Sequence, residues 1–313
     1  MSAGTSAGGD TGGAGRLREV VVVLNPNSTG DGPANARGLA EELAERVPQL
    51  RVRLAETQHA GHAEDIAHDA VAEAGDAGGV LVVSASGDGG YHEVVNGVVR
   101  AQRTGRGVGA AAVLASGNAN DHATATQERP LADAVVEAAE GGGFDRMDLL
   151  EVAATGQEPR VAHSYVGVGI TPVAAAALNE HDLDAAKETY LVVRAFWRYR
   201  PLTVVHDGRE VRIDSLVFAN IDRMAKYAQL SSTSAPDDGR FETLLIPHRS
   251  KLRLLAEFLR VLRGRFEVES REAPYTFTTR NPMPLQMDGE VVSVPGGTDV
   301  TVRCLPLALR TVR

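Results

Sequence analysis

Short apolar runs alternate with longer amphipathic segments along the first half of the chain. Residues 19–24 form a run of β-branched residues that ends at a turn-like Asn-Pro-Asn, a pattern typical of a strand buried on both faces. The segment 34–46 carries Leu39 and Leu43 at helical spacing and is followed by Pro48, which predicts a helix that ends there. The first unit is therefore a buried strand followed by a helix.

This unit repeats up to about residue 114. Further strands are predicted over 50–55, 79–83 and 108–114, and further helices over 62–74 and 91–100. Strands that alternate with helices of this length predict parallel pairing with right-handed crossovers. The fold class predicted for this part is a Rossmann-like, doubly wound α/β domain that binds its ligand at the carboxyl ends of the strands.

The pattern changes after about residue 144. Short extended segments separated by Gly, Pro and Asp predict an antiparallel β domain. They cover 148–153, 161–168, 202–205, 210–213, 216–220, 241–246, 275–279 and 291–294. Two helices are predicted within this domain, over 172–200 and 251–263. The predicted organisation is a flexible tail over 1–15, a nucleotide-binding α/β domain over 16–145 and a β domain over 146–299.

Composition excludes several classes of protein. The chain has 313 residues, 43% of them hydrophobic, which is enough for a sizeable core. Its 32 Lys and Arg against 41 Asp and Glu give a net charge of -9, which argues against a nucleic-acid partner. No apolar run has the length of a spanning helix or a signal-peptide core, so we expect a cytoplasmic location. The single cysteine, Cys304, excludes an internal disulfide and is interpreted as a small buried hydrophobe.

The segment Ser86-Gly87-Asp88-Gly89-Gly90 carries the strongest chemical signal. A buried strand leads into this glycine-rich turn, and a helix is predicted directly after it. Glycines let a phosphate approach backbone N–H groups, the helix N-terminus favours the anion, and Asp88 can hold a cation beside it. The alternative is a tight turn in which Asp88 caps the helix.

Two other loops are predicted at the same edge of the sheet. One is Asn25–Gly32, after the first strand, and the other is Ser116–Asp121, after the fourth. Three loops of small residues at strand carboxyl ends form a cradle suited to the phosphates of a nucleotide. The chain contains neither GxxxxGK[ST] nor GxGxxG, which excludes a P-loop enzyme.

Four motifs in the same order resemble the diacylglycerol kinase catalytic fold, which bacterial lipid kinases, ceramide kinases and sphingosine kinases share. They are NPxS near residue 25, SGDGGxxEVxNG from Ser86, SGNAND from Ser116 and Met287-Asp288-Gly289-Glu290. The stretch from Ala235 to Phe241 resembles a further family segment. The resemblance implies an α/β nucleotide domain followed by a β-sandwich, with ATP between them and 300–313 returning to the first domain.

The resemblance also implies roles for individual residues. Asp88 corresponds to the carboxylate that organises Mg²⁺ near the phosphates, and Glu290 to the proposed general base, with Asp288 beside it. Asp238, with the backbone of Ala235 and Arg240, corresponds to a structural Mg²⁺ site. The implied nucleotide-site residues are Asn25, Ser28, Thr57, Ser86, Gly87, Asp88, Gly89, Gly90, Tyr91, His92 and Asn118.

Phosphoryl transfer requires the same parts on physical grounds. It needs a cation on the phosphates, backbone donors, and a carboxylate near the proton of the attacking hydroxyl. Asp288 and Glu290 are two residues apart, so a strand or a turn projects both to one side. Without the other motifs, an acidic turn between Leu285 and Val291 is the simpler interpretation.

The predicted function is therefore transfer of the ATP γ-phosphoryl group to a hydroxyl of a lipid or amphiphilic alcohol, such as diacylglycerol or a sphingoid base. Three departures from the family pattern support a second hypothesis. Gly90 and Asn118 each replace a threonine, and Asp31 places a negative charge in the first loop, as a catalytically impaired nucleotide- or lipid-binding protein would show. A third hypothesis is an NAD kinase, because that family shares the GGDG turn.

Two segments bear on the acceptor and on membrane contact. Residues 251–266 predict a basic amphipathic helix, which suits transient contact with the inner membrane face or packing on the sandwich with a solvated basic side. Residues 190–200 concentrate aromatic side chains and correspond to the family's helix beside the lipid pocket, with core packing as the alternative. A homodimer is a further expectation.

Overall fold

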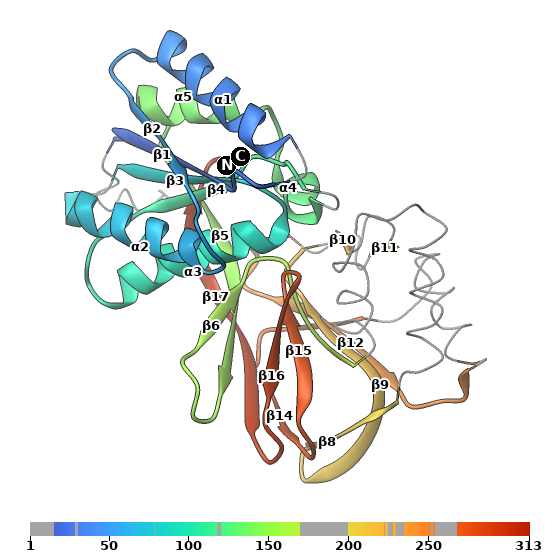
Figure 1. Cartoon of the computed structure of the whole chain (residues 1–313). Coiled ribbons are helices and arrows are strands. Elements are labelled where there is room, and N and C mark those ends of the chain that lie inside the picture. Colours follow the sequence, from blue (N-terminus) through green and yellow to red (C-terminus); the bar gives the residue numbers. More distant parts are fainter. Residues whose placement is uncertain are drawn as a thin grey trace, which may run out of the picture.

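The computed structural model shows a first domain of mixed helices and strands above a second domain made of strands (Figure 1). It describes residues 16–28, 31–77, 79–117, 120–169, 200–221, 223–224, 228–229, 235–251, 253 and 268–313. The helices predicted over 172–200 and 251–263 therefore lie, except for residues 200, 251 and 253, outside the described residues.

The first domain is a parallel sheet with the strand order β2-β1-β3-β4. Its elements are β1 (Glu19–Leu24), α1 (Gly32–Arg46), β2 (Arg51–Glu56), α2 (His62–Ala74), β3 (Val80–Ala85), α3 (Asp88–Arg103), β4 (Ala110–Val113), α4 (Asp121–Thr126) and α5 (Leu131–Glu137), with a 3-10 turn over Gly75–Ala77 and a π-helical turn over Ala138–Gly142. Leu24 pairs with Glu56 on one side and Ala85 on the other, so β1, β2 and β3 end at one edge. This confirms the predicted α/β class.

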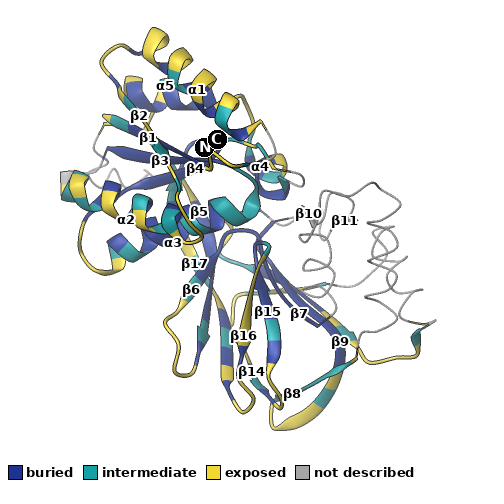
Figure 2. Ribbon diagram, in the orientation of Figure 1, coloured by how far each residue is buried: buried dark blue, intermediate teal, exposed yellow. Residues whose placement is uncertain are grey.

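Helices cover both faces of this sheet. In Figure 1, α1 and α5 lie on one face and α2 and α3 on the other. Every residue of β3 is buried, and Figure 2 shows the exposed residues gathered on the outer sides of the helices. Burial on two faces explains why β1 and β3 appear in the sequence as continuous β-branched runs.

The second domain is one curled, mainly antiparallel sheet. Its path runs β16-β15-β7-β9-β8-β14-β17-β5-β6, with β12 pairing to β9 and β13 to β12. The strands are β5 (Asp145–Ala154), β6 (Arg160–Ala162), β7 (Tyr165–Gly169), β8 (Leu202–His206), β9 (Arg209–Ala219), β12 (Phe241–Pro247), β13 (Glu269–Arg271), β14 (Tyr275–Thr279), β15 (Met283–Met287), β16 (Glu290–Val294) and β17 (Asp299–Thr311); β10 (Arg223–Met224) and β11 (Ala228–Gln229) form a separate pair. Among the described strands, this path ends at β16 on one side and at β6 on the other.

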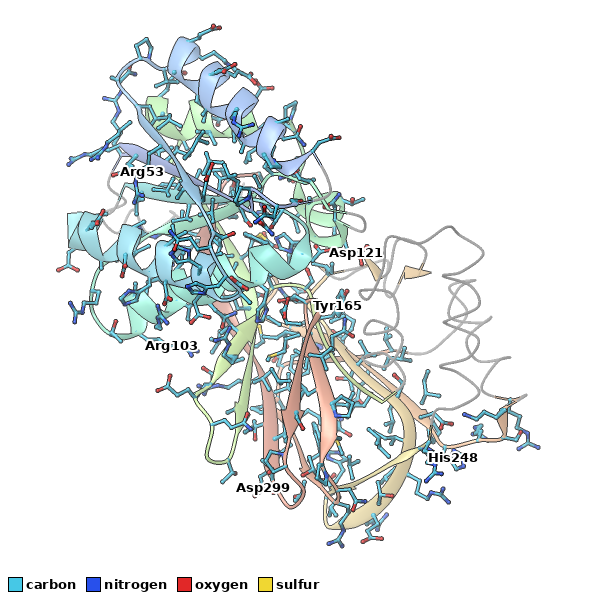
Figure 3. All side chains as sticks on the ribbon, in the orientation of Figure 1. Arg53, Arg103, Asp121, Tyr165, His248 and Asp299 are labelled. Atoms are coloured by element: carbon cyan, nitrogen blue, oxygen red, sulfur yellow. The ribbon has the colours of Figure 1, made fainter. Side chains whose placement is uncertain are left out.

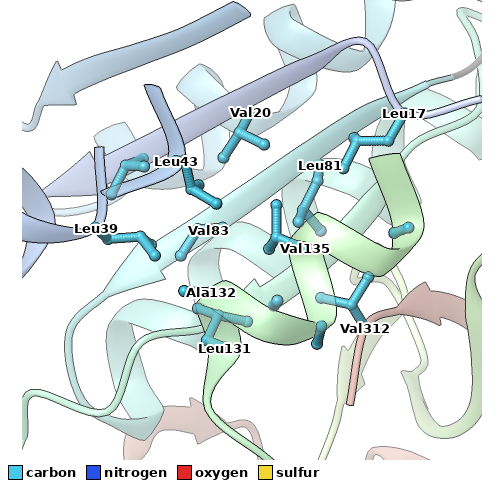
Figure 4. Packing of buried hydrophobic residues seen from close by; sticks show 14 of the residues in the cluster. Leu17, Val20, Leu39, Leu43, Leu81, Val83, Leu131, Ala132, Val135 and Val312 are labelled. Atoms are coloured by element: carbon cyan, nitrogen blue, oxygen red, sulfur yellow. The ribbon is translucent and has the colours of Figure 1, made fainter. Parts of the chain in front are cut away.

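The final strand, β17, belongs to both domains. It pairs with β14 and β5, and its register shifts between Leu305 and Leu309, where Leu307 has a left-handed φ of 51°. Before this irregularity Val302 lies in the core of the β domain, and after it Leu309 lies in the core beneath the α/β sheet. Val312 then packs with Leu131 and Val135 on the other face of that sheet, as Figure 4 shows.

Three details differ from the sequence-based prediction. The strands predicted over 210–213 and 216–220 are one strand, β9, because Asp214 between them is buried and accepts hydrogen bonds from the His248 side chain and the Arg249 backbone N–H. Helix α5 was not predicted, nor was β15, which contains a proline that would argue against a strand. Among the described residues, no helix is long and apolar enough to span a membrane.

Candidate active site

Six of the predicted nucleotide-site residues line one cleft at the carboxyl edge of the parallel sheet. The cleft has a volume of about 920 Å³, and its lining includes Asn25, Ser28, Thr57, Ser86, Gly87 and Gly90. The sheet register produces this convergence, because the loops after β1, β2 and β3 start at paired residues. Asn118 lies outside the described residues.

Acidic side chains give the described lining of the cleft its charge. Its described lining residues include no Lys or Arg, whereas Asp31 and Glu93 both contribute to it. A polyphosphate bound there would have to be neutralised by backbone N–H groups and by a cation. The cleft therefore suits a phosphate ligand that arrives with its own metal ion.

Glu93, in the second turn of α3, fixes the loop that carries Thr57. Its carboxylate accepts hydrogen bonds from the backbone N–H groups of Gly61 at 2.9 Å and Ala63 at 3.2 Å, at the start of α2. A negative charge at a helix N-terminus is stabilising, so this contact holds α2 against α3. The sequence offered a signal for this role, since Glu93 is the Glu of the SGDGGxxEV motif.

Asp88, the first residue of α3, is not among the residues that line the cleft, and its carboxylate faces the start of α4. Its carboxylate accepts hydrogen bonds from the backbone N–H groups of Asp121 at 3.1 Å and His122 at 3.2 Å. Asp88 thus caps α4 and not α3, whose N-cap is Gly87 without a side-chain hydrogen bond. The contact joins the glycine-rich turn after β3 to the loop after β4.

The surroundings of Asp88 favour a nearby cation. Burial raises the pKa of Asp88, and the neighbouring Asp121 carboxylate raises it further, although His163 and the two hydrogen bonds oppose this shift. Asp121 is itself buried, at 2% exposure, and lies at the junction of the domains (Figure 3). We did not predict Asp121 as a site residue, although it is the last residue of the SGNAND motif.

Asp288, the first residue of the turn between β15 and β16, is completely buried. Its carboxylate accepts backbone N–H groups from His163 at 2.9 Å, Ser164 at 2.9 Å and Tyr165 at 3.1 Å, and lies 2.9 Å from His92 Nδ1. Burial acts to raise the pKa of Asp288, but His163, His92 and the backbone donors outweigh it and hold that pKa well below its usual range. This arrangement suits positioning of the turn better than proton transfer.

Glu290, two residues later, is exposed and reaches the first turn of α3. Its Oε1 atom lies 2.9 Å from the point that a β-carbon on Gly89 would occupy. Gly89 therefore lets a carboxylate from the second domain approach the helix N-terminus of the first. Asp288 and Gly289 both have positive φ angles, which makes the turn that aims Glu290.

Glu290 lines a second cavity, on the side of the curled sheet where β16 and β5 approach α3. This acceptor-side cavity, as we call it, has a volume of about 470 Å³. Its apolar wall comes from β5, β15 and β16 and consists of Val152, Ala154, Leu285, Met287, Val292 and Val294. His92 also lines it, and Glu93 lines both this cavity and the cleft at the carboxyl edge of the parallel sheet, which we call the nucleotide cleft after the prediction from the sequence. The two cavities therefore meet along the first two turns of α3.

Side chains of α3 fasten the two domains at this junction. The Asn96 side chain pairs with Val161, donating to its carbonyl at 2.9 Å and accepting from its N–H at 3.0 Å. Tyr91 packs against the rings of His122 and His163, with centroids 4.9 and 4.6 Å away. Burial holds the pKa of His122 well below its usual value and also lowers that of His163.

Four of the described residues predicted at the nucleotide site, Asp88, Gly89, Tyr91 and His92, do not line the cleft, and the last two of them lie well away from it. Tyr91 is fully buried and lines neither cavity, and His92 faces the acceptor-side cavity. Both sit in the helix directly after the glycine-rich turn, where sequence proximity gives no information about the direction of a side chain.

The residues predicted for a second Mg²⁺ site come together as a tight turn. Asp238 accepts hydrogen bonds from the backbone N–H groups of Ala235 at 3.3 Å and Arg240 at 2.9 Å. The neighbouring Asp148, missed in the sequence, accepts from Gly239 N–H at 2.6 Å and Leu307 N–H at 2.7 Å. Within the described part of the chain, no three His, Cys, Asp or Glu side chains form a metal-binding group.

Comparison with protein families agrees with this architecture. Residues 19–152 match the diacylglycerol kinase catalytic domain. Residues 164–313 match the YegS C-terminal NAD kinase beta sandwich-like domain. The chain belongs to the diacylglycerol kinase catalytic domain family and carries the YegS type of C-terminal domain.

Solved structures share the fold at low sequence identity. A candidate diacylglycerol kinase from Bacillus anthracis str. Sterne is 17% identical with a TM-score of 0.65, over 95% of this chain and 97% of that one. A second diacylglycerol kinase structure from that organism is 15% identical with a TM-score of 0.64, over 94% and 96%. Yeast NADH kinase complexed with NADH is 12% identical with a TM-score of 0.50, over 95% and 83%. No curated protein matches the chain.

Proposed function

We propose that the protein is an ATP- and Mg²⁺-dependent kinase that phosphorylates a hydroxyl group of an amphiphilic alcohol. The observation that carries the proposal is the meeting of two unlike cavities at α3. The polar cleft presents Ser86, Gly87 and Gly90, and the largely apolar cavity presents Glu290. A phosphate donor and an amphiphilic acceptor would thus face each other across the glycine-rich turn at the start of α3.

The donor set beside Asp88 fits a magnesium ion that is shared with a nucleotide. Magnesium is usually held by one or two protein carboxylates, with phosphate oxygens and waters completing its shell. Asp88 at the start of α3 and Asp121 at the start of α4 supply neighbouring carboxylates. When bound there, the ion would neutralise charge on the transferring phosphoryl group.

Glu290 is the side chain that we assign as the general base, which accepts the proton of the acceptor's hydroxyl group. It is exposed in the acceptor-side cavity and approaches Gly89 at the helix start, so it faces both the acceptor and the phosphates. Asp288, within the same turn, anchors it through four hydrogen bonds of its carboxylate. In this scheme Glu290 accepts the hydroxyl proton as the oxygen attacks phosphorus, and Asp288 keeps Glu290 in place.

The acceptor-side cavity supports an amphiphile as the substrate. Its apolar wall would cover a hydrocarbon chain, and its carboxylate end would face the hydroxyl group. The NADH of the yeast enzyme that shares this fold provides the second candidate. The apolar residues of the cavity favour the amphiphile.

The decisive experiment incubates the purified full-length chain with γ-labelled ATP, Mg²⁺ and, separately, diacylglycerol, a sphingoid base, NAD and a total lipid extract. We expect label in a lipid product. Label in NAD alone would show an NAD kinase, and ATP binding without product in any incubation would show a non-catalytic binding protein. Glu45→Gln, an exposed change on α1, serves as the control for the variants below.

Two variants test the assigned roles. Glu290→Gln should leave ATP binding nearly unchanged and lower turnover by about 10²-fold or more, the usual size of a general-base contribution. Asp88→Asn should lower turnover by a similar factor and shift its dependence on Mg²⁺ concentration, because it removes charge near the cation. Wild-type turnover by Glu290→Gln, with chemistry rate-limiting, would refute the base assignment.

A further inference from the structure

His92, in the second turn of α3, is a buried side chain that no step of the proposed reaction uses. It is 2% exposed and lines the acceptor-side cavity together with Glu290. Its Nδ1 atom lies 2.9 Å from Asp288 Oδ2. Because that carboxylate also accepts three backbone N–H groups, it is ionised and can only accept, so Nδ1 carries a proton and donates it to Asp288.

The other ring nitrogen, Nε2, has no proton donor in the part of the chain that the structure describes. Its polar side-chain neighbour there is Asn96 Nδ2, at 3.2 Å. The Asn96 amide has two protons, and it donates at 2.9 Å to the carbonyls of both His92 and Val161. The Val161 N–H donates to Asn96 Oδ1 at 3.0 Å and fixes this orientation of the amide. Nε2 therefore keeps a free lone pair, and a buried acceptor without a donor is unfavourable.

The remaining polar lining of the acceptor-side cavity is rich in hydrogen-bond acceptors. Its described carboxylates are those of Glu64, Glu93, Glu158 and Glu290. Arg160 pairs with Glu64 at 2.9 Å, which leaves the Gln157 amide as the unpaired side-chain donor among the described lining residues. Such a lining suits a head group that brings O–H or N–H donors better than one that brings ester oxygens.

We propose that His92 Nε2 recognises a second hydrogen-bond donor of the acceptor, a hydroxyl or ammonium group beside the hydroxyl that is phosphorylated. The inference rests on the proposed function and narrows its substrate class to amphiphiles with two neighbouring polar donors. Asp288 holds His92 and lies two residues before Glu290, so one turn sets the positions of both acceptors. Glu290 takes the proton of the reacting hydroxyl, and His92 accepts a hydrogen bond from the second donor without taking its proton.

Three synthetic ethers test the inference with the purified full-length chain, γ-labelled ATP and Mg²⁺. All carry a hexadecyl chain and one primary hydroxyl, and the neighbouring carbon bears a second hydroxyl, an ammonium group or only hydrogen. The measured quantity is the ratio of kcat/KM for each two-donor ether to that for the one-donor ether. We expect a ratio of about ten or more for at least one of them, because the one-donor ether leaves Nε2 unpaired. The two-donor ether with the higher ratio identifies the donor.

Variants of His92 show whether this side chain is the origin of the preference. His92→Phe and His92→Met remove both nitrogens from a side chain of similar size and should bring the ratio to about one. Two variants are compared so that failure of one to fold leaves the other. A purely structural loss lowers the rates with all three ethers alike and leaves the ratio unchanged. Asn96→Ala is the matched control, because it removes contacts with Val161 at the same junction but keeps Nε2, and it should keep the wild-type ratio.

The outcomes separate this inference from the proposed function. A wild-type ratio of about one for both two-donor ethers would overturn the inference and leave the kinase proposal intact. A wild-type ratio that persists in a folded His92 variant would overturn the assignment to His92. No product from any of the three ethers or from the lipid extract would instead refute the proposed function, and the inference with it.

Discussion

At the scale of single residues, the site depends on the absence of a side chain at Gly89. The carboxylate of Glu290 occupies the space beside it, so the smallest added group displaces that carboxylate. The glycine-rich turn therefore has two separate requirements. Gly90 leaves room for Ser86 within the first domain, and Gly89 leaves room for Glu290 from the second.

Gly89→Ala should lower kcat by about tenfold and leave the KM for ATP nearly unchanged. The new methyl group would push Glu290 away from the phosphate side without touching the nucleotide cleft, and a displacement of this size is costly to catalysis. Steady-state kinetics with ATP and the labelled acceptor measure this split. Gly38→Ala is the matched control, because a β-carbon at that helical glycine meets nothing within 4 Å. Wild-type kcat for Gly89→Ala would contradict the account.

Cys304 should be a slow thiol in the native protein. Burial and the neighbouring Asp148 carboxylate raise the pKa of Cys304 to about 12, so very little thiolate is present at pH 8. Alkylation by iodoacetamide at pH 8 should be at least about tenfold slower in the native protein than after unfolding in guanidinium chloride. Equal rates in the two states would show that the thiol is accessible and unperturbed.

At the scale of elements, α3 and the β15–β16 turn act as one unit. On α3, His92 contacts Asp288 and Asn96 contacts Val161, both in the second domain. The Asp288 carboxylate also accepts a hydrogen bond from the backbone N–H of Tyr165, the first residue of β7. The position of Glu290 relative to Asp88 is thereby set by buried hydrogen bonds and not by a loop. The catalytic geometry that we propose is preformed across the domain junction.

Asp288→Asn should lower the free energy of unfolding by about 3 kcal/mol, because it leaves buried backbone donors facing an amide that carries one oxygen. Asp207→Asn is a close control, since Asp207-Gly208 forms a hairpin turn with the same φ of 50° at the aspartate but is exposed. Denaturant unfolding at pH 7 measures both. A loss below about 0.5 kcal/mol for Asp288→Asn would show that the carboxylate is not needed for the junction.

The same carboxylate predicts how stability depends on pH. The pKa of Asp288 is lowered in the folded state, so its contribution is fully present above the unfolded value near 4 and is lost as the pH falls toward the folded value. Below pH 4 the wild type should therefore lose up to about 1.4 kcal/mol per pH unit more than Asp288→Asn. Unfolding titrations at pH 5, 4 and 3 compare the slopes. Parallel slopes for the two proteins would contradict this linkage.

Much of the element pattern could be predicted from the sequence, because buried parallel strands and amphipathic helices have distinct periodicities. Helix α2 was predicted with the same bounds, and the α/β class and the β-sheet domain were both confirmed. The direction of side chains near the site could not be predicted. Asp88, Tyr91 and His92 lie within one turn and a half of the same helix, yet they face α4, the core and the acceptor-side cavity, because packing decides among helix faces.

At the scale of the whole molecule, the two domains share one continuous strand. Val302 packs in the β domain and Leu309 and Val312 pack in the α/β domain, so β17 and the residue after it have side chains in three hydrophobic clusters. The α3 junction adds buried polar contacts beside the site. The acceptor-side cavity, which residues of both domains line, therefore lies between parts that are connected twice, whereas the cleft proposed for the donor is lined by the first domain alone.

This double connection predicts that the domains unfold together. Leu43→Ala, Leu216→Ala and Leu309→Ala each remove a completely buried leucine, from the α/β core, the β core and the shared strand respectively. Each substitution should cost about 2–5 kcal/mol and lower the same single calorimetric transition by several degrees. Independent domains would instead give two transitions, with Leu43→Ala lowering one and Leu216→Ala lowering the other. Leu309→Ala distinguishes these cases, because it should affect both domains only if β17 couples them. Differential scanning calorimetry at several heating rates measures these transitions. Equal calorimetric and van't Hoff enthalpies of unfolding would show that one cooperative unit unfolds.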